Sequence, residues 1–514
     1  MPANVMVIGL DAAEATLIER WTSDGGLPAL KRFFSGCRTV HLTNSLDILP
    51  GAIWHELATG RSCGKAPLYF HPRQLRTGES RPRPIRAEDI FPEDFFWNIA
   101  DRSGCKTLAF DMPMTSLDPD SKSIQVVDWG PHDRISGAAG HPPELFDELV
   151  AKYGSYPVAA CDRHGRKRPG YEQLLEGLIQ GARQKTDIAL DFLKREYWDL
   201  FTCVYGETHC AGHQFWHFQD PGHGWYEPSA PDHLQESLKH VYSCVDEGVG
   251  ALVEKAGPEA NVLIVASHGM GPVMRGPQLL PEVLVRLGMG SGGGKGLTSY
   301  LRRLQRLVSH APRKIQPLLQ LLAHKPGIRS IERASGCLVE PLDSPRTRAV
   351  ALENDTCGAI RLNLKGREPN GSVAPGREAD TLIEELRREL LALREPATDQ
   401  SIVKNAVTAV EAFGPDHHPD VPDLMVAFRT DLGPLESCVS ESLGHIHVPI
   451  FHPNIPRSGE HNAHSRLWCK GPAFSGAAAG ATGSALDLAP TVLRLLGLPL
   501  PETLDGKPLV GNGS

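Results

Sequence analysis

Two histidines four residues apart stand out in the middle of the chain. His209 and His213 lie in the segment ETHCAGH, which directly follows the apolar run LFTCVY. On a helix, residues at i and i+4 share one face, so the two imidazoles can bind one metal ion. An isolated pair can equally have an ordinary packing role, but the position after a strand, with Glu207 adjacent, favours metal binding. Cys210 points away from the shared face and is expected to be a spacer.

Further metal-ligating side chains follow other apolar runs. Asp11 ends the run VMVIGL, and His268 follows NVLIVA in a glycine-rich turn, while His461 lies in the late segment SGEHNAHSR. Polar groups at the carboxyl ends of strands open into the ligand crevice of an α/β sheet. Asp11 could instead cap the helix that follows it, and a single histidine in a loop is weak evidence by itself. Asp11, Glu207, His209 and His268 all fall beyond the carboxyl ends of predicted strands, so each is a candidate for the ligand site there.

Short apolar runs alternate with amphipathic stretches along the chain. The runs are rich in β-branched or aromatic residues and bounded by polar or glycine turns, as in buried parallel strands: Val5–Leu10, Thr107–Phe110, Leu200–Tyr205 and Val262–Ala266. Helical spacing of apolar residues covers Gln173–Leu193, His233–Lys255 and Glu378–Leu393. This alternation predicts an α/β fold, with an open, mainly parallel sheet flanked by helices on both faces.

Length, charge and cysteine usage narrow the class of protein. The 514 residues allow one large domain with insertions, or two to three domains. The net charge of -8 does not indicate nucleic-acid or anionic-membrane binding. The N-terminus has no basic segment before its short apolar run, and no apolar run approaches the roughly 18 residues of a transmembrane helix. The 11 scattered cysteines, without a C-x-x-C pair, favour reduced thiols. We therefore expect a cytoplasmic enzyme without nucleic-acid or membrane partners.

A Gly-rich segment at 288–296 precedes a strongly basic one at 297–334, in which Glu332 is the acidic residue. Leucines such as Leu301 and Leu304 recur between the arginines and lysines. One interpretation is a helical cap that presents positive charge to an anionic substrate or partner. The other is a helical insertion with a solvated charged face and an apolar face packed on the core.

Six segments, in this order, resemble the alkaline phosphatase superfamily, in its type I phosphodiesterase and nucleotide-pyrophosphatase branch. They are VMVIGLDAAEATLIERWTSDGGLPAL, WHELATGR, ETHCAGHQFWHFQD, ASHGMGP, SGEHNAHSRLWCKGP and LDLAPTVLRLLGLPLPETLDGKPL. The resemblance implies an alkaline-phosphatase-like α/β core over residues 1–275 and 345–514. Residues 276–344, which include the basic segment, fall where family members carry variable insertions, and we expect them to form a mainly helical cap.

The resemblance also implies a chemistry. The expected activity is hydrolysis of a phosphate ester on a small anionic molecule, through a phosphodiester or pyrophosphate-type linkage. The resemblance implies one or two divalent metal ions, usually zinc, manganese or iron. Carried over residue by residue, one ion would be held by His209, His213 and His461, and the other by Asp11 and His268. Three imidazoles with an open position suit a catalytic zinc.

The sequence departs from the family pattern at three positions. His209 and Ser267 stand where the family usually has aspartate, and Pro50 stands where it has the nucleophile. Thr43 and Ser45, upstream of Pro50, are the nearest hydroxyl candidates.

Three interpretations of these departures remain open. In the first, a single metal ion acts through a bound hydroxide. In the second, the second metal site is rebuilt with a residue such as Asp47 or Glu207. In the third, the chain is a catalytically inactive relative that binds a ligand. A phosphoryl-transfer enzyme is a further alternative, but it would need a nucleophile that the expected loop does not offer.

Overall fold

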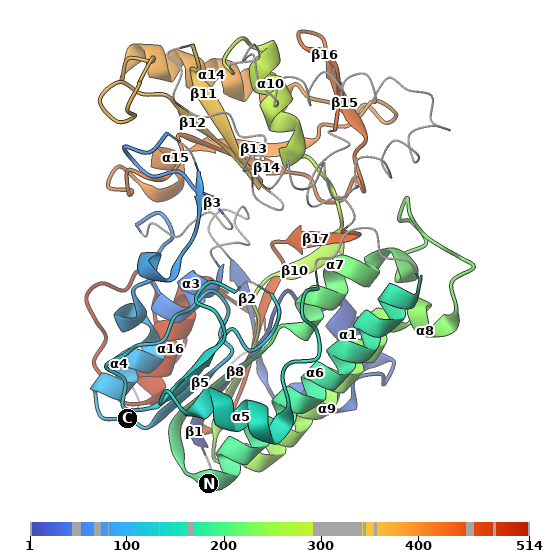
Figure 1. The fold of residues 1–514 in the computed structure, drawn as a ribbon, viewed down its shortest axis with the longest axis vertical. Helices are drawn as coiled ribbons and strands as arrows, with labels where there is room; N and C mark the ends of the chain where they lie inside the picture. Colours follow the sequence, from blue (N-terminus) through green and yellow to red (C-terminus); the bar gives the residue numbers. More distant parts are fainter. Residues whose placement is uncertain are drawn as a thin grey trace. The chain divides into compact units, whose positions relative to one another are not determined.

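The computed structural model describes residues 3–43, 53–65, 73–80, 82–132, 134–161, 168–290, 342, 346–353, 357–448, 457–475 and 480–511. The chain forms two compact units, each built from segments distant in sequence (Figure 1). Unit 1 comprises Met1–Leu68, Arg86–Pro272 and Ser458–Ser514, and unit 2 comprises Tyr69–Ile85 and Val273–Arg457. Residues 346–457, which fall within the predicted core segment 345–514, lie in unit 2, and the predicted domain boundaries stay a prediction. The basic segment 297–334 lies outside the described residues, so the helical cap stays a prediction.

Unit 1 is built on a nine-stranded sheet, counted over the described residues, with the strand order β19-β2-β18-β9-β1-β8-β5-β6-β7. The central strand β1 (Ala3–Leu10) is parallel to β8 (Trp198–Tyr205) on one side and to β9 (Asn261–Ala266) on the other. Beyond β8 lie β5 (Thr107–Phe110) and β6 (Ile124–Val127), also parallel. At one edge of the sheet, β7 (Ala139–His141) is antiparallel to β6. On the other side, β18 (Ser465–Lys470) is antiparallel to both β9 and β2 (Arg38–Thr43). β19 (Ala481–Ser484) is parallel to β2 and forms the second edge. The predicted open, mainly parallel sheet is confirmed.

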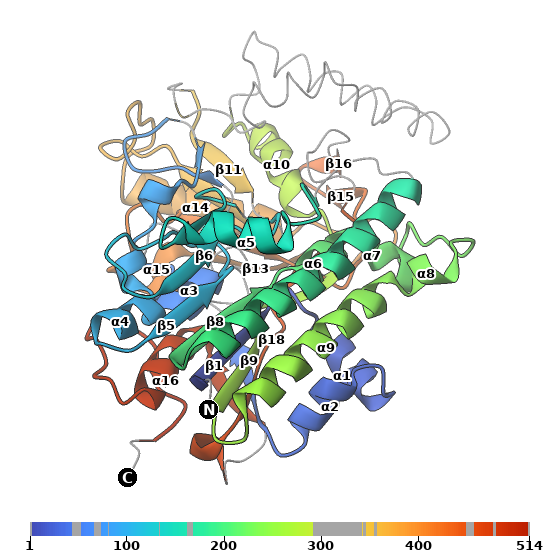
Figure 2. The ribbon, with the colours of Figure 1, turned by 60° about the horizontal axis from the view of Figure 1, so that its bottom comes forward.

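Helices cover both faces of this sheet. The long helices α6 (Arg168–Arg195) and α9 (Ser237–Ala256) run side by side, as Figures 1 and 2 show, and pack with α7 (Glu207–Gln219) on apolar residues of β1 and β8. The remaining helices of unit 1 are α1 (Ala15–Ser23), α2 (Pro28–Phe34), α3 (Ile53–Thr59), α4 (Phe96–Arg102), α5 (Leu145–Tyr153), α8 (Asp232–Gln235) and α16 (Leu488–Leu495). On the opposite face, a Cβ at Gly9 would lie 2.5 Å from the Trp54 ring, so the glycine lets α3 approach the centre of β1.

Unit 2 contains a four-stranded antiparallel sheet of the order β11-β12-β14-β13. Its strands are β11 (Ala349–Glu353), β12 (Cys357–Leu362), β13 (Val403–Thr408) and β14 (Leu424–Phe428). Helices α10 (Leu280–Arg286) and α14 (Arg377–Leu391) contribute to the apolar core of the unit. Smaller elements are α15 (Ala409–Phe413), the β15–β16 pair (Ser437–Ser440 and Gly444–His447) and the β3–β4 pair (Arg73–Gln74 and Arg83–Pro84).

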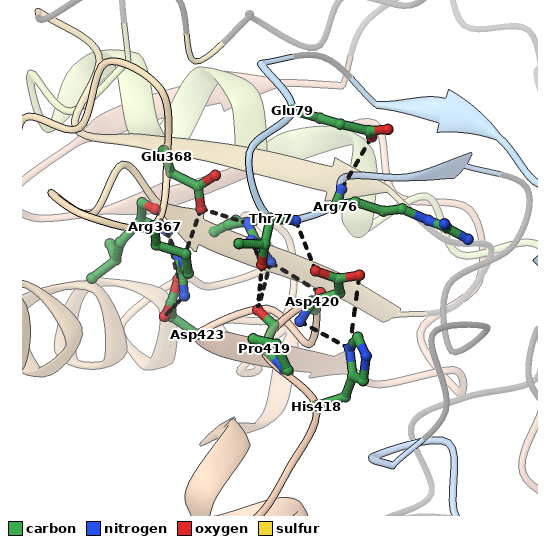
Figure 3. A network of polar contacts seen from close by, with 11 residues as sticks. Arg76, Thr77, Glu79, Arg367, Glu368, His418, Pro419, Asp420 and Asp423 are labelled. Carbon is green, nitrogen blue, oxygen red and sulfur yellow. Dashed lines mark hydrogen bonds and ion pairs between the residues drawn. The ribbon is translucent and has the colours of Figure 1, made fainter.

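A buried polar network fastens the segment 73–80 to the rest of unit 2 (Figure 3). The backbone N–H of Thr77 donates to Asp420 Oδ1 at 2.7 Å. Arg361 is fully buried; its Nε donates to Glu368 Oε1 at 2.8 Å and its Nη1 to the Asp420 carbonyl at 3.0 Å. The buried charge of Arg361 needs these partners to be stable. The network therefore holds the segment 73–80, which is distant in sequence, in its place in unit 2.

The predicted elements agree closely with those observed. All four predicted strands lie within β1, β5, β8 and β9, and the predicted helices correspond to α6, α9 and α14. His233 falls in the separate short helix α8, because the chain turns at Glu236 before α9 begins. Among the described residues, no helix is both long and apolar enough to cross a membrane.

Candidate metal centre

The carboxyl ends of the parallel strands bring polar side chains to one edge of the unit 1 sheet. Asp11 follows β1, Asp111 follows β5, Asp128 follows β6, Glu207 follows β8 and His268 follows β9. The φ angles of Asp111 and Asp128 are 56° and 53°, and that of Ala12, next to Asp11, is 48°. Non-glycine residues seldom adopt this left-handed region, and strain of this kind clusters at functional sites.

Three imidazoles meet at this edge. Helix α7 carries His209 and His213 one turn apart, and strand β17 (Gly459–Asn462), which lies beside α7, carries His461 (Figure 1). Nε2 of His209 lies 2.9 Å from Nε2 of His213 and 2.9 Å from Nε2 of His461. All three side chains are buried. The structure therefore brings together the predicted trio.

The hydrogen bonds assign the tautomers of two of these rings. Nδ1 of His213 lies 2.8 Å from the carbonyl oxygen of Gly459, which can only accept, so Nδ1 carries the proton. Nδ1 of His209 likewise donates to Asp11 Oδ2 at 2.6 Å. In the neutral rings, Nε2 then carries a lone pair, and two lone pairs 2.9 Å apart repel each other. A positive charge between them removes this repulsion, and three imidazoles with an open position are a zinc-type ligand set. The residues present thus fit a divalent metal ion.

Asp11 has both carboxylate oxygens engaged. Oδ2 accepts from His209, and Oδ1 accepts from the indole Nε1 of Trp54 at 2.6 Å and from the Ser267 hydroxyl at 3.3 Å. Burial raises the pKa of Asp11, but attraction to His209 and His268 and the hydrogen bonds from His209 and Trp54 outweigh it and hold the pKa well below its usual range. Asp11 is therefore an ionised acceptor that orients His209, an arrangement common behind metal-ligating histidines.

A close approach of two backbones positions His213. A Cβ at Gly459 would lie 2.1 Å from the carbonyl oxygen of Gly212, so only glycine lets β17 come this near to α7. The approach places the Gly459 carbonyl within reach of His213 Nδ1 and the backbone N–H of Ser458 2.8 Å from the His213 carbonyl. The strand that carries His461 is thereby fixed to the helix that carries the other two histidines.

The same strand pairs with β10 (Gly269–Pro272), where Met270 lies opposite His461. Glu14 joins the two strands, because its Oε2 accepts from the Met270 backbone N–H at 3.1 Å and from the Asn462 amide at 2.8 Å. Burial raises the pKa of Glu14, but hydrogen bonds from His464, Thr16 and Asn462 outweigh it and lower that pKa overall. The ionised carboxylate of Glu14 thus joins β10 and β17 through hydrogen bonds.

His268 stands directly before β10, with its ring centroid 4.4 Å from that of His461 and 5.9 Å from that of His209. Its Nδ1 lies 3.0 Å from the Ser267 hydroxyl, which also reaches Asp11. Ser267 therefore links Asp11 to His268. Within the described residues, the converging groups of three ligand atoms are His132 with His209 and His213, His213 with Glu460 and His461, and His132 with Cys161 and Cys210. Asp11 and His268 belong to none of these groups.

Two residues that the sequence reasoning missed join the histidines. His132 offers a ligand nitrogen within 4.8 Å of those of His209 and His213, and Glu460 offers an oxygen within 4.8 Å of His213 and His461. Glu460 could have been found as the neighbour of His461 in SGEHNAH. His132 lies five residues beyond the end of β6, a strand that the apolar pattern did not single out.

A small cavity of about 20 Å³ adjoins Asp11 and His132, enough room for about one water molecule.

Lys185, fully buried on α6, donates to the Val204 carbonyl at 2.8 Å and forms ion pairs with Asp111 at 2.8 Å and Glu207 at 3.3 Å. Burial lowers the pKa of Lys185, but the two carboxylates outweigh it and raise the pKa overall. The Tyr156 hydroxyl donates to Glu207 Oε1 at 2.8 Å. This network supports the first residue of α7.

Of the two hydroxyl candidates for a nucleophile, the structure describes Thr43 and not Ser45. Thr43 is the last residue of β2, and its hydroxyl donates to the carbonyl of Gly483 on the edge strand β19 at 3.1 Å. Ser45, Asp47 and Pro50 lie outside the described residues. A nucleophilic role for Thr43 or Ser45 stays a prediction.

Comparisons with known proteins identify the family and the fold. The family model for type I phosphodiesterase/nucleotide pyrophosphatase matches residues 5–435. No curated protein sequence matches the chain. Wild-type alkaline phosphatase PafA has a similar structure, with a TM-score of 0.52 and 12% identity over 99% of this chain and 98% of that one. Murine ectonucleotide pyrophosphatase/phosphodiesterase 5 gives 0.46 and 13%, over 98% and 97% of the two chains. Phosphonoacetate hydrolase from Sinorhizobium meliloti, with phosphonoformate, gives 0.49 and 11%, over 96% and 95%. The likeness to PafA concerns the fold.

Proposed function

Since this chain belongs to the type I phosphodiesterase/nucleotide pyrophosphatase family of the alkaline phosphatase superfamily, we propose that it hydrolyses a phosphate ester with a divalent metal ion, zinc by its ligand set. The substrate is a small anionic molecule with a phosphodiester or pyrophosphate-type linkage. The observation that carries the proposal is that Nε2 of His209 lies 2.9 Å from Nε2 of both His213 and His461, at the sheet edge where ligands of α/β folds bind.

In this proposal, His209, His213 and His461 hold the metal ion. When bound, a divalent ion supplies Lewis-acid polarisation of a phosphoryl oxygen. The chain itself supplies orientation. Asp11 fixes the ring of His209 through Nδ1, and the Gly459 carbonyl fixes the ring of His213 in the same way. Each acceptor also makes its imidazole more basic at Nε2, which strengthens metal binding.

The charges at this edge favour a substrate with one negative charge on the reacting phosphate. Asp11, Asp111 and Glu207 are acidic, and Lys185, buried beside the last two, already forms ion pairs with both. A phosphodiester carries one negative charge at neutral pH, whereas a phosphomonoester carries nearly two. The diester therefore meets less repulsion here.

The test is a panel of three chromogenic or nucleotide substrates: bis(p-nitrophenyl) phosphate, p-nitrophenyl phosphate and a dinucleotide pyrophosphate. Each is assayed with the protein as purified, after chelation, and after zinc or manganese is restored. We expect hydrolysis of the diester or the pyrophosphate in preference to the monoester, with activity lost on chelation and regained with metal.

His213→Ala should lose this turnover, whereas His217→Ala, one turn further along the same helix, should keep it. Absence of turnover on every substrate, with metal restored, would contradict the proposal and leave a ligand-binding relative. Thr43→Ala belongs in the same series, because loss of turnover with the fold and the metal content unchanged would support Thr43 as the nucleophile.

A further inference from the structure

A second cluster of metal-ligating atoms lies beside the three histidines. Nδ1 of His132 is 3.0 Å from the Sγ of Cys161. The ligand atoms of His132, Cys161 and Cys210 all lie within 4.8 Å of one another. Cys210 is the residue between His209 and His213 that points away from their shared face. It directs its sulfur to this second cluster, so the same helix serves both groups.

The three residues come from separate parts of unit 1. His132 lies in the loop after β6, Cys161 in the loop after α5, and Cys210 in the first half of α7. The two cysteines are 2% and 1% exposed, and His132 is half-buried. Neither Cys161 nor Cys210 forms a disulfide bond in the structure. Two sulfurs and an imidazole nitrogen therefore converge from segments that no local pattern would bring together.

This donor set has a definite chemistry. Two thiolates and one imidazole form the ligand set of a known type of zinc site with an open fourth position, and thiolates select zinc or copper(I) over harder ions. Cys244, another buried thiol of unit 1, instead donates to the Ile179 carbonyl at 3.5 Å. The Cys161–Cys210 pair differs because a nitrogen ligand faces it.

We propose that His132, Cys161 and Cys210 form a second, sulfur-containing metal site next to the three-histidine centre. On binding, both thiols lose their protons to solvent and coordinate the ion as thiolates. The ring centroid of His132 also lies 3.9 Å from that of His209, so the two centres are neighbours across one imidazole. This site does not depend on the proposed hydrolysis.

The probe is cobalt(II) added to the metal-stripped, reduced full-length protein, followed by absorption spectroscopy. Cobalt bound to thiolate gives an intense charge-transfer band in the near ultraviolet, whereas cobalt bound to nitrogen and oxygen alone does not. We expect this band in the wild type. It should be lost in Cys161→Ser and in Cys210→Ser, and kept in Cys244→Ser and in His213→Ala.

His132→Gln provides a second route if either cysteine variant misfolds, because His132 is partly exposed. It should weaken the cobalt affinity measured from the band by at least about tenfold. Cobalt binding without a thiolate band, a band unchanged in both cysteine variants, or a Cys161–Cys210 disulfide that survives reduction would overturn the proposal. Retention of the band in His213→Ala separates this site from the first, whatever the outcome of the hydrolysis assays.

Discussion

The Asp11 carboxylate lies against the outer nitrogen of His209, with 2.6 Å between Oδ2 and Nδ1. In the proposed metal centre, Asp11 therefore acts through His209. This arrangement favours the interpretation with one metal ion held by His209, His213 and His461, since both oxygens of Asp11 are occupied by His209 and Trp54.

Replacing Asp11 with asparagine tests this relationship. The amide removes the negative charge behind His209 but keeps the shape, so we expect metal affinity to fall about 10- to 100-fold without loss of the folded protein. Competition with a chelator measures the affinity, and Asp191→Asn on the surface serves as the control. An affinity within twofold of the wild type would contradict the role assigned to Asp11.

The close approach at Gly459 gives a steric prediction. In Gly459→Ala the new methyl group meets the Gly212 carbonyl, a backbone atom that cannot rotate away. We expect a loss of about 1–3 kcal/mol in the free energy of unfolding, together with weaker metal binding, because His213 loses its carbonyl acceptor. Gly271→Ala on the neighbouring strand is the matched control, since its Cβ would lie 3.6 Å from Asn462. Equal stability of both variants would show that β17 can move without cost.

We expect Lys185 to contribute more to the free energy of unfolding than an exposed lysine does. Lys185→Met leaves the carboxylates of Asp111 and of fully buried Glu207 without their cation, so unfolding in urea should show a loss of about 3–5 kcal/mol. Lys152→Met removes the exposed partner of Asp191 and should change stability little. A Lys185→Met variant as stable as Lys152→Met would mean that the network is hydrated.

His55 predicts an acid-sensitive contribution to stability. Burial, with a smaller contribution from the charge of Arg61, lowers the pKa of His55 from 6.5 to about 4. The unfolded chain therefore binds this proton more readily than the folded one. Stability is fully present above pH 6.5 and falls as the pH drops towards about 4, by up to about 3 kcal/mol from this group.

Urea unfolding of wild type and His55→Gln between pH 7 and pH 4 measures this effect. The variant should show a shallower loss of stability, while His240→Gln on the surface should follow the wild type. Parallel curves for wild type and His55→Gln would rule out the buried neutral histidine as the cause.

Much of the fold could be predicted because local patterns determine it. The central strands are continuous apolar runs, and α6, α9 and α14 show regular apolar spacing. The division into units could not be predicted in this way. The segment around Thr77 joins unit 2 through Asp420, 343 positions away, and no local pattern carries such a contact.

The candidate site was predictable to a similar degree. The spacing of His209 and His213 was sufficient to place them on one helical face, whereas His461 was added only through the family resemblance. His132 was missed because its loop has no periodic pattern. The position of Asp11 behind His209 required coordinates, because the sequence shows only that a carboxylate ends the strand.

The most direct test of the central claim is the metal content of the purified protein, measured by elemental mass spectrometry on the same samples used for diester hydrolysis. Wild type, His213→Ala and His217→Ala are compared. The account predicts that His213→Ala loses a metal ion and turnover together, while His217→Ala keeps both. Full metal content and full turnover in His213→Ala would show that the three histidines are not the catalytic metal centre.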